Sequence, residues 1–271
     1  MGTTNKLGTA LITGASTGIR ATYADRLARR GYDLILVARN KPTLEKVAAS
    51  LGAQTGVRVQ ALPADLTKKA DLEHVEQVLR DVASMSLLVN NAGTATLAPF
   101  ATADSDRLDH DIQLNVVAPT RLSRAVLPGF FQRNRGGIIN IGSVMSQMVQ
   151  PGNSVYGATK ACLLHFSEVL ALEVGDSAVR VQAVLPGATR TALWDLAGVG
   201  IKNLPADILM EVDEMVDGAL AGFDQGEQVT VPSLPDTGDW QRLVKARADL
   251  RPNLSRNHSA PRYKIPAFAA A

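Results

Sequence analysis

The sequence has little of what secreted, metal-binding or membrane-spanning proteins use. Among its 271 residues is a single cysteine, which excludes an internal disulfide and favours a reducing compartment. No apolar run approaches the roughly 20 residues that a transmembrane helix needs. The four histidines are far apart and lack the spacing of metal ligands, so we expect surface or core roles for them and no metal site. They are His74, His110, His165 and His258.

An excess of charge of either sign is also missing. The 28 basic and 26 acidic residues are spread along the chain and leave a formal net charge of +2. Such a distribution provides no basic stripe for nucleic acid or anionic lipid. The N-terminal segment Met1–Lys6 has neither the charged nor the apolar region of a signal peptide, and Lys6 replaces the Ser or Thr of a myristoylation signal. We therefore expect a cytoplasmic protein without nucleic-acid or membrane partners.

The composition is that of a globular domain, with 46% hydrophobic and 20% charged residues. At this length, about three quarters of the surface of the unfolded chain can be buried. We expect one domain over residues 1–250 and a tail over 251–271, which carries three prolines and little periodicity. Cys162 lies in an apolar helical segment, so we expect a buried small hydrophobe rather than a reactive thiol.

Short apolar runs alternate with longer segments of helical period. The runs predict strands at 9–13, 34–37, 57–62, 87–90, 137–141, 179–185 and, at an edge, 228–231. The longer segments predict helices at 19–30, 43–51, 71–83, 105–131, 154–174 and 213–223. Because parallel neighbours need long crossover connections, this alternation predicts an α/β fold, a doubly wound parallel sheet of about seven strands in Rossmann-like order with helices on both faces.

Two breaks in this pattern carry further expectations. Gly31 falls where the first helix should end in a left-handed cap. After Pro186-Gly187 the alternation stops, and residues 189–210 combine weak periodicity with several turn-forming residues. We interpret this segment as a mobile flap beside a substrate site.

A glycine-rich turn follows the first expected strand, with the sequence Thr13-Gly14-Ala-Ser-Thr-Gly18. Small residues between a strand and a helix let a dinucleotide pyrophosphate approach the backbone and the helix N-terminus. Glycines also serve ordinary tight turns, so the turn alone is a weak indication of nucleotide binding.

A tyrosine and a lysine lie one helical turn apart, in Tyr156-Gly-Ala-Thr-Lys160, thirteen residues beyond Ser143. A free phenol has a pKa of about 10, too high for acid–base work near neutrality. An ammonium on the same helix face favours the phenolate, so this pair is suited to moving a proton. A proton from this pair and a hydride from a bound dinucleotide together indicate redox chemistry between carbonyl and alcohol.

Further motifs occur in a distinctive order. Asn90-Asn-Ala-Gly93 ends the fourth expected strand, Asn115 lies inside the long helix, and Ser143 follows the fifth strand. With the glycine turn and the Tyr156–Lys160 pair, the chain resembles the short-chain dehydrogenase/reductase family from Thr9 to about Thr191.

The resemblance implies a catalytic tetrad. Tyr156 matches the family's acid–base tyrosine, which protonates the carbonyl oxygen during reduction. Lys160 matches the lysine that lowers the tyrosine pKa and holds the nicotinamide ribose. Ser143 matches the serine that hydrogen-bonds the substrate oxygen, and Asn115 the asparagine that supports a water relay. The alternative interpretation gives neither residue a catalytic role: Tyr156 is then a core or surface aromatic residue and Lys160 a solvated charge.

The resemblance also implies a set of contacts to the cofactor. Ala38 and Arg39 end the second strand, where an acidic residue would accept the 2′-hydroxyl of NAD and a cation would meet the 2′-phosphate of NADP, so NADP(H) is favoured over NAD(H). Thr17, however, is not the basic residue that many NADP-dependent relatives have in the turn. The expected contacts are Gly14, Ser16, Thr17, Gly18, Ile19, Arg39, Asp65, Leu66, Asn91, Ala92, Gly93, Tyr156, Lys160, Pro186, Gly187, Thr189 and Thr191.

Structural alternatives remain for several of these positions. Arg39 is otherwise a surface charge, and Asp65 a cap of the next helix. Pro186-Gly187 is otherwise only the end of a strand. Met145 and Met148 either line an apolar substrate pocket or pack within their loop, and Trp194 in the flap has the same two interpretations.

The function expected from these residues is NADP-dependent hydride transfer between nicotinamide and a ketone, aldehyde or secondary alcohol. The resemblance also implies a homodimer or homotetramer, paired through the long helix and the helix of Tyr156. The alternative is a non-catalytic dinucleotide-binding redox sensor or regulatory protein. The sequence does not identify the substrate, because the flap carries no recognised motif.

Arg20 stands where the family has the third glycine of the turn. That glycine permits close packing at the start of the first helix, so a long side chain is expected to weaken cofactor affinity unless its guanidinium reaches a phosphate. We predict that Arg20→Gly binds NADPH more tightly than the wild type. Titration of NADPH into both proteins measures this difference, and equal dissociation constants would reject it.

Overall fold

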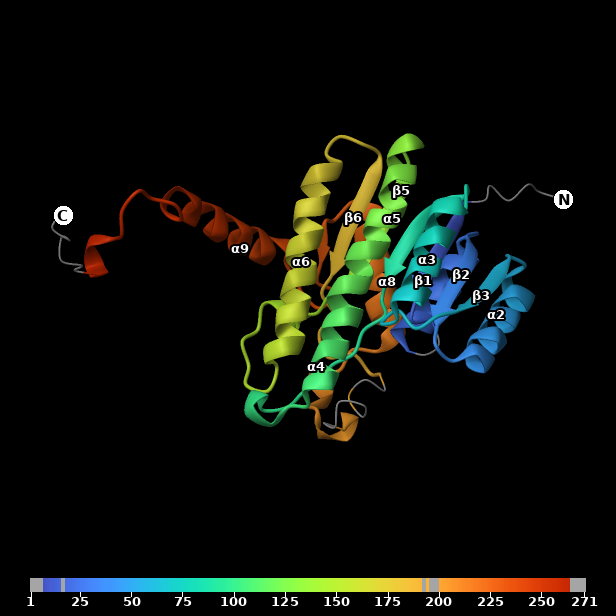
Figure 1. The fold of residues 1–271 in the computed structure, drawn as a ribbon, viewed down its shortest axis with the longest axis horizontal. Helices are drawn as coiled ribbons and strands as arrows, with labels where there is room; N and C mark the ends of the chain where they lie inside the picture. The colour runs from blue at the N-terminus through green and yellow to red at the C-terminus, as the bar shows by residue number, and fades with distance from the viewer. Residues whose placement is uncertain (1–6, 16–17, 192–193, 195–199, 264–271) are drawn as a thin grey trace. The chain divides into compact units, whose positions relative to one another are not determined.

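The computed structural model describes residues 7–15, 18–191, 194 and 200–263, except for the side chain of Arg20. Ser16 and Thr17 and parts of the expected flap and tail lie outside the described residues. Seven strands form one sheet in the order β3-β2-β1-β4-β5-β6-β7, and every pairing is parallel. The expected doubly wound α/β fold is therefore confirmed (Figure 1).

The strands are β1 (Thr9–Thr13), β2 (Asp33–Ala38), β3 (Val59–Pro63), β4 (Met85–Asn90), β5 (Gly136–Ile141), β6 (Val179–Val184) and β7 (Val229–Thr230). The main helices are α1 (Ile19–Arg29), α2 (Lys41–Thr55), α3 (Lys69–Asp81), α4 (Ser105–Ile112), α5 (Ala118–Gln132), α6 (Ser154–Val174), α8 (Val212–Gln225) and α9 (Thr237–Leu250). A π-helical segment, η2 (Gln113–Val117), joins α4 to α5, and 3-10 turns include η3 (Val144–Ser146), η4 (Ile201–Asn203) and η5 (Ala206–Ile208).

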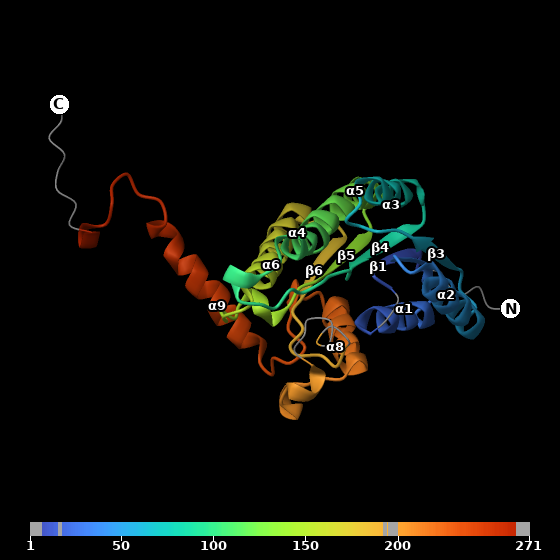
Figure 2. The same cartoon turned by 60° about the horizontal axis from the view of Figure 1, so that its bottom comes forward.

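Helices cover both faces of the sheet. Figure 2 shows α3, α4, α5 and α6 on one side and α1, α2 and α8 on the other. Neighbouring residues of a strand point to opposite faces, so Ala10 and Ile12 of β1 pack into the core beneath α1 and α8, whereas Leu11 packs beneath α3 and α5. The strands consequently read as continuous apolar runs, and β1, β2 and most of β4 are fully buried.

Local sequence signals explain several helix ends. The Asn40 side chain accepts a hydrogen bond from the Thr43 N–H at the start of α2, and Gly56 ends that helix in the left-handed region with a φ of 73°. Asp104 caps α4 by accepting from two backbone N–H groups. Gly31, with a φ of 94°, follows α1 as expected.

The structure differs from the sequence-based expectations in four places. The long helix is interrupted by η2, and the expected edge strand shortens to Val229–Thr230. Helix α9 was not predicted, because none of its residues is buried and its apolar residues form no strong periodic signal. The expectation for Cys162 is wrong, since this side chain is exposed. Helix α6 is apolar on several faces, so periodicity did not reveal which one is buried.

The chain divides into two compact units, Met1–Ser233 and Leu234–Ala271. The first holds the sheet and its covering helices, and the second holds α9. Within the described part of the chain, no helix is long and apolar enough to span a bilayer.

Tyr23, on α1, has a fully buried side chain whose hydroxyl finds no hydrogen-bond partner among the described residues. Burial raises the pKa of Tyr23, against a smaller lowering by Arg30. In the unfolded chain a tyrosine ionises near pH 10, so the protonated phenol supports folding below about pH 10 and that support is lost as pH rises further.

We predict that Tyr23→Phe leaves the free energy of unfolding unchanged or raises it by up to about 1 kcal/mol at neutral pH, because it removes an unpaired buried polar group. Urea unfolding measures this change. Repeated at increasing pH, the measurement should show a steeper loss of stability above about pH 10 in the wild type than in the variant. Tyr263→Phe, at an exposed tyrosine, is the control. A loss of more than about 1 kcal/mol in Tyr23→Phe at neutral pH would contradict the prediction.

Candidate functional site

The strand order reverses between β1 and β4, so the loops that follow these two strands diverge at one edge of the sheet. Thr13, the last residue of β1, joins the two loops. Its Oγ1 accepts hydrogen bonds from the backbone N–H groups of Asn91 and Ala92, each at 3.0 Å. The glycine turn and the Asn-Ala-Gly segment therefore lie together, although 78 residues separate Thr13 from Asn91.

The glycine turn has the backbone conformation that its composition suggests. Gly14 and Gly18 have φ angles of 75° and 60°, in the region that side chains disfavour. A Cβ on Gly18 would lie 3.5 Å from Cγ2 of Thr191, so the turn faces the segment that follows β6. Ile19 begins α1 directly after Gly18, and no described side chain caps this helix N-terminus.

Two features of this crevice fit a dinucleotide. The first is the N-terminus of α1, which no described side chain caps and whose backbone N–H groups and dipole favour a phosphate. The second is Asn91, which is buried and whose Nδ2 has no hydrogen-bond partner among the described residues. A buried amide donor without a partner is costly, and a bound polar ligand would satisfy it.

Asn115 lies in the wide turn η2 and is 1% exposed. Its Oδ1 accepts from the Thr94 N–H at 3.0 Å, while its Nδ2 donates to the Thr94 carbonyl at 2.9 Å and to Thr159 Oγ1 at 3.1 Å. A Cβ on Gly93 would lie 3.1 Å from Asn115 Oδ1 and 3.5 Å from Lys160 Nζ. The absence of a side chain at Gly93 therefore lets the β4 loop pass beside the amide and the ammonium.

Lys160 is 6% exposed and extends along α6 toward the end of β5. Its Nζ donates a hydrogen bond to the Ile141 carbonyl at 2.8 Å and lies 5.7 Å from the centre of the Tyr156 ring. The one-turn spacing in the sequence thus brings the ammonium beside the aromatic ring.

Ser143 is buried at the end of β5, where its Oγ accepts from the Met145 N–H at 3.1 Å and caps η3. Burial raises the pKa of Tyr156, the nearby Ser143 hydroxyl opposes this increase, and the charge of Asp111 adds to it. The shift is thus opposite in direction to the lowering expected from Lys160.

Arg39 and Asp65 follow β2 and β3, which are neighbours in the sheet. Arg39 is exposed. Burial tends to raise the pKa of Asp65, but hydrogen bonds from Thr67 and the charges of Arg39 and Lys68 lower it on balance. Asp65 Oδ1 accepts from both the N–H and the Oγ1 of Thr67. The N-cap position of α3 is Lys68, so Asp65 is not the cap of that helix. Leu66 is buried and lies in the same short loop as Asp65.

The segment after β6 reaches the same edge of the sheet. Pro186 is buried, and its carbonyl accepts a hydrogen bond from the Val144 N–H beside Ser143. Thr189 pairs with Met210 in an isolated bridge, which closes the base of the expected flap. Trp194 Nε1 donates to the Thr189 carbonyl at 2.9 Å, so this side chain is tied to the base of the segment.

A family model described as short chain dehydrogenase matches residues 8–198. The chain belongs to the short-chain dehydrogenase/reductase family.

Solved structures of this family resemble the chain over nearly its full length. A short-chain dehydrogenase from Sphingobium yanoikuyae in complex with NADPH is 49% identical, covers 94% of this chain and 100% of its own, and has a TM-score of 0.91. The bulky-bulky ketone specific alcohol dehydrogenase from Comamonas testosteroni is 44% identical, with 96% and 99% coverage and a TM-score of 0.87.

Two curated relatives share less of the sequence. The oxidoreductase UcpA of Escherichia coli strain K12 is 36% identical over 77% of this chain and 80% of its own. The very-long-chain 3-oxoacyl-CoA reductase of Anas platyrhynchos is 33% identical over 65% of this chain, and the match spans only 58% of that relative.

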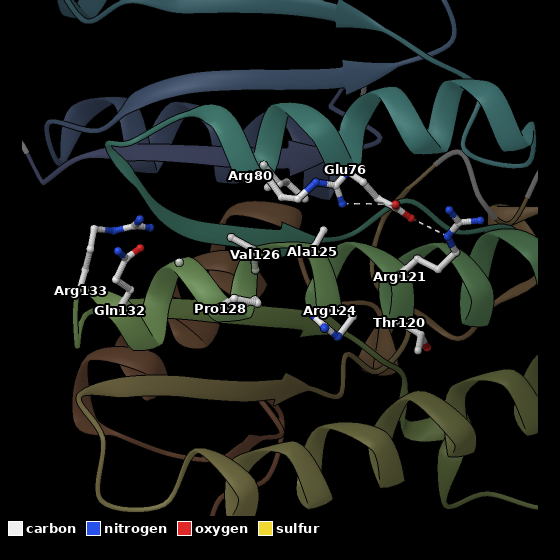
Figure 3. Close-up of a pocket in the computed structure, with 12 residues that line it drawn as sticks. Glu76, Arg80, Thr120, Arg121, Arg124, Ala125, Val126, Pro128, Gln132 and Arg133 are labelled. Carbon is white, nitrogen blue, oxygen red and sulfur yellow. Dashed lines mark hydrogen bonds and ion pairs between the residues drawn. The ribbon is translucent and has the colours of Figure 1, made fainter.

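A cavity of about 770 Å³ lies away from these residues, between α3 and α5 of this short-chain dehydrogenase/reductase (Figure 3). Its arginines are largely engaged within the protein. Glu76 pairs with both Arg80 and Arg121, and Arg133 donates to the Met85 carbonyl at 2.8 Å. The described residues that line the cavity include no tyrosine, serine or lysine, so its size does not make it the site of the family's chemistry.

Sequence reasoning missed a buried polar network behind the site. Asn90 Nδ2 donates to Asn140 Oδ1 at 2.8 Å and to Ser123 Oγ at 3.1 Å. Asn140 Nδ2 donates in turn to Ser167 Oγ at 2.8 Å. The network links α5, β4, β5 and α6. In the sequence, these polar residues stand inside otherwise apolar segments, and that was the available signal for a buried polar network.

Proposed function

We propose that this protein is an NADP-dependent short-chain dehydrogenase/reductase that interconverts a carbonyl compound and an alcohol. The observation that carries the proposal is the convergence of Ser143, Tyr156, Lys160 and Asn115 at the edge of the sheet that also holds the glycine turn. The relative from Sphingobium yanoikuyae, whose structure contains NADPH, supports the choice of cofactor class.

NADP(H), when bound, would supply or accept the hydride. Gly14, Gly18, Ile19 and the N-terminus of α1 would hold its pyrophosphate. Asn91, Ala92 and Gly93 would line the nicotinamide side of the crevice, and Lys160 would hold the nicotinamide ribose. Asp65 and Leu66 would flank the adenine. Ser16, Thr17, Pro186, Gly187, Thr189 and Thr191 complete the proposed contacts.

Arg39 supports NADP(H) over NAD(H). Arg39 is exposed and directly follows β2, and two donors of a guanidinium suit a ribose 2′-phosphate. A carboxylate at this position would instead accept hydrogen bonds from a 2′-hydroxyl.

The proton would come from Tyr156. A substrate oxygen beside Tyr156 and Ser143 would receive two hydroxyl donors, and the Ser143 hydroxyl is close enough to affect the pKa of Tyr156. As negative charge develops on that oxygen, the Tyr156 hydroxyl would transfer its proton and the Lys160 ammonium would stabilise the phenolate. Asn115 holds the Thr94 loop beside this pair and would support a water that resupplies the proton.

The proposed substrates are ketones, aldehydes or secondary alcohols. Similarity to the alcohol dehydrogenase from Comamonas testosteroni favours ketones with two large substituents. Met145, half-buried in the turn that Ser143 caps, would offer apolar surface to such a substrate.

A homodimer or homotetramer in the cytoplasm remains our proposal for assembly and location. Exposed apolar side chains on α5 and α6, the helices through which the family resemblance implies pairing, favour such an assembly. They are Phe131 on α5, which is 43% exposed, and Val169 and Leu172 on α6, which are 38% and 75% exposed.

The alternative is a non-catalytic dinucleotide-binding sensor, motivated by Arg20 in place of the third glycine. A protein that only binds a dinucleotide has no need of a serine hydroxyl that acts on the pKa of Tyr156. Turnover over a panel of carbonyl compounds distinguishes the two functions.

We predict that the wild type oxidises NADPH in the presence of ketones, and that Tyr156→Phe lowers kcat by about 100-fold or more because the general acid is lost. The dissociation constant for NADPH should change little, since the ring is retained. Absorbance of NADPH measures turnover, and fluorescence titration measures binding. Binding without turnover over a panel that includes ketones with two large substituents would favour the sensor.

We predict that Arg39→Ala raises the dissociation constant for NADPH by about 10- to 100-fold, because a charge-assisted hydrogen bond to the 2′-phosphate is worth roughly 1.5–3 kcal/mol. The constant for NADH should stay within about twofold. Lys41→Ala, at an exposed cation that begins the adjacent α2, is the matched control. Equal losses for NADPH and NADH would show that Arg39 does not read the phosphate.

A further inference from the structure

The cavity of about 770 Å³ between α3 and α5 has no part in the proposed chemistry. Its volume lies in the range of small-molecule sites in proteins, roughly 300–1,000 Å³. Four of the twelve described residues that line it are arginines, and one, Glu76, is acidic. The lining therefore has a formal charge of +3, which exceeds the +2 of the whole chain.

Glu76 holds two of these arginines in place. Its side chain is 12% exposed; Oε1 accepts a hydrogen bond from Arg121 Nε, and Oε2 lies 3.6 Å from Arg80 Nη1. Figure 3 shows the two guanidinium groups reaching Glu76 from α5 and α3. The half-exposed Glu73 adds only a longer ion pair, 3.8 Å from Arg121, and shares it with Lys69. A guanidinium has five N–H donors, so both arginines keep donors for a ligand.

Arg133 lies at the other end of the labelled stretch of α5, and Gly129 makes room for it (Figure 3). A Cβ on Gly129 would lie 3.1 Å from Arg133 Nη1 and 3.3 Å from Nη2. Nη2 donates to the Met85 carbonyl at 2.8 Å, and the guanidinium lies 5.9 Å from the centre of the Phe130 ring. Among the described residues, Nη1 has no hydrogen-bond partner. The third arginine is thus fixed through one nitrogen and keeps another available.

Arg124 is the fourth arginine and is exposed. In the part of the chain that the structure describes, it forms no ion pair or hydrogen bond. It follows Arg121 by three residues on α5, and residues at this spacing are neighbours on a helix surface. Like charges at such a distance repel each other, and an anion between them would relieve the repulsion.

The cavity is elongated and has an apolar base. Arg121 and Arg133 are twelve residues apart, which corresponds to a rise of about 18 Å along a helix. Buried residues line the cavity between them, among them Ala125 and Val126. Phe131, an exposed apolar residue that favours pairing of copies, is not among the described lining residues. The cavity is therefore distinct from that apolar patch.

We propose that the cavity between α3 and α5 is a second ligand site, which binds an elongated organic anion with at least two phosphate or carboxylate groups. Arg80, Arg121 and Arg124 would bind one anionic group and Arg133 another, while the apolar base contacts the atoms between them. Guanidinium groups suit both kinds of anion because their N–H donors match paired oxygens. The inference stands apart from the proposed function, since the cavity and the dinucleotide crevice share no residue.

The test is calorimetric titration of the wild type with inorganic tripolyphosphate, at about 50 mM salt, where screening is weak. Citrate, titrated in the same way, shows whether carboxylates replace phosphates. We expect a dissociation constant of about 1 mM or lower for at least one of these probes. Because the crevice also favours phosphate, NMR signals of the arginine Nε–H groups, assigned with single variants, identify the arginines that respond.

Two variants probe the cavity itself. Arg124→Ala should raise the dissociation constant by about tenfold, because a charge-assisted hydrogen bond is lost. Gly129→Ala, which places a Cβ against the Arg133 guanidinium, should also weaken binding. Alanine is favourable within a helix, so both variants should fold. Arg107→Ala, at an exposed arginine of α4, is the matched control, and Arg39→Ala should leave the response of the cavity arginines unchanged.

Three outcomes would overturn the inference. The first is no response of the cavity arginines up to about 10 mM of either probe. The second is binding that Arg124→Ala and Gly129→Ala both leave unchanged. The third is a change of molar mass in Arg124→Ala, measured by light scattering, without binding of either probe to the wild type. That result would show that a second copy of the chain covers the cavity.

Discussion

The parallel pairing of β4 with β1, on the side opposite β2, is the constraint on which the rest of the site depends. Because the strand order reverses here, the glycine loop and the Asn-Ala-Gly loop begin side by side at one edge of the sheet and then diverge, which leaves a crevice between them. Thr13 Oγ1 joins the two loops by accepting two backbone N–H groups. A crevice at this point needs no further scaffold, because the strands that form it are buried on both faces and cannot slide without exposing apolar residues.

Around this crevice, buried polar groups are paired mostly with backbone. Asn115 bonds both the N–H and the carbonyl of Thr94, and Lys160 donates to the Ile141 carbonyl. Backbone partners belong to strands and loops whose positions are already set by the sheet. The side chains are therefore held in place before any ligand binds, which lowers the reorganisation that catalysis requires. Asn91 departs from this pattern, since its Nδ2 has no partner in the described part of the chain and lies where the proposed cofactor would bind.

Much of the fold could be predicted because the signals are local. The run Thr9–Thr13 and the helix Ser154–Val174 have the expected bounds, since apolar runs and helical periods are written along the chain. Helix α9 was missed because it buries none of its residues. The exposure of Cys162 was missed because α6 is apolar on more than one face. The elements that pack against α6 decide which face is covered, and the sequence of the helix does not show this.

The candidate residues could be named from motif spacing, but their electrostatics could not. Spacing predicts that Lys160 lies near Tyr156, and from this a lowered tyrosine pKa was expected. The structure adds burial and Asp111, which act in the other direction and prevail. Asp111 lies on α4 and Tyr156 on α6, two helices that pack together although α5 and β5 separate them along the chain.

The amino-acid sequence by itself determined the alternation of strands and helices, the positions of the special turns and the chemical types of the side chains. The tertiary structure alone decided which of those side chains meet and whether each lies in water or protein. The reason is physical. Periodicity and turn preference act between residues a few positions apart, whereas burial and the strength of a charge depend on every segment packed around a group.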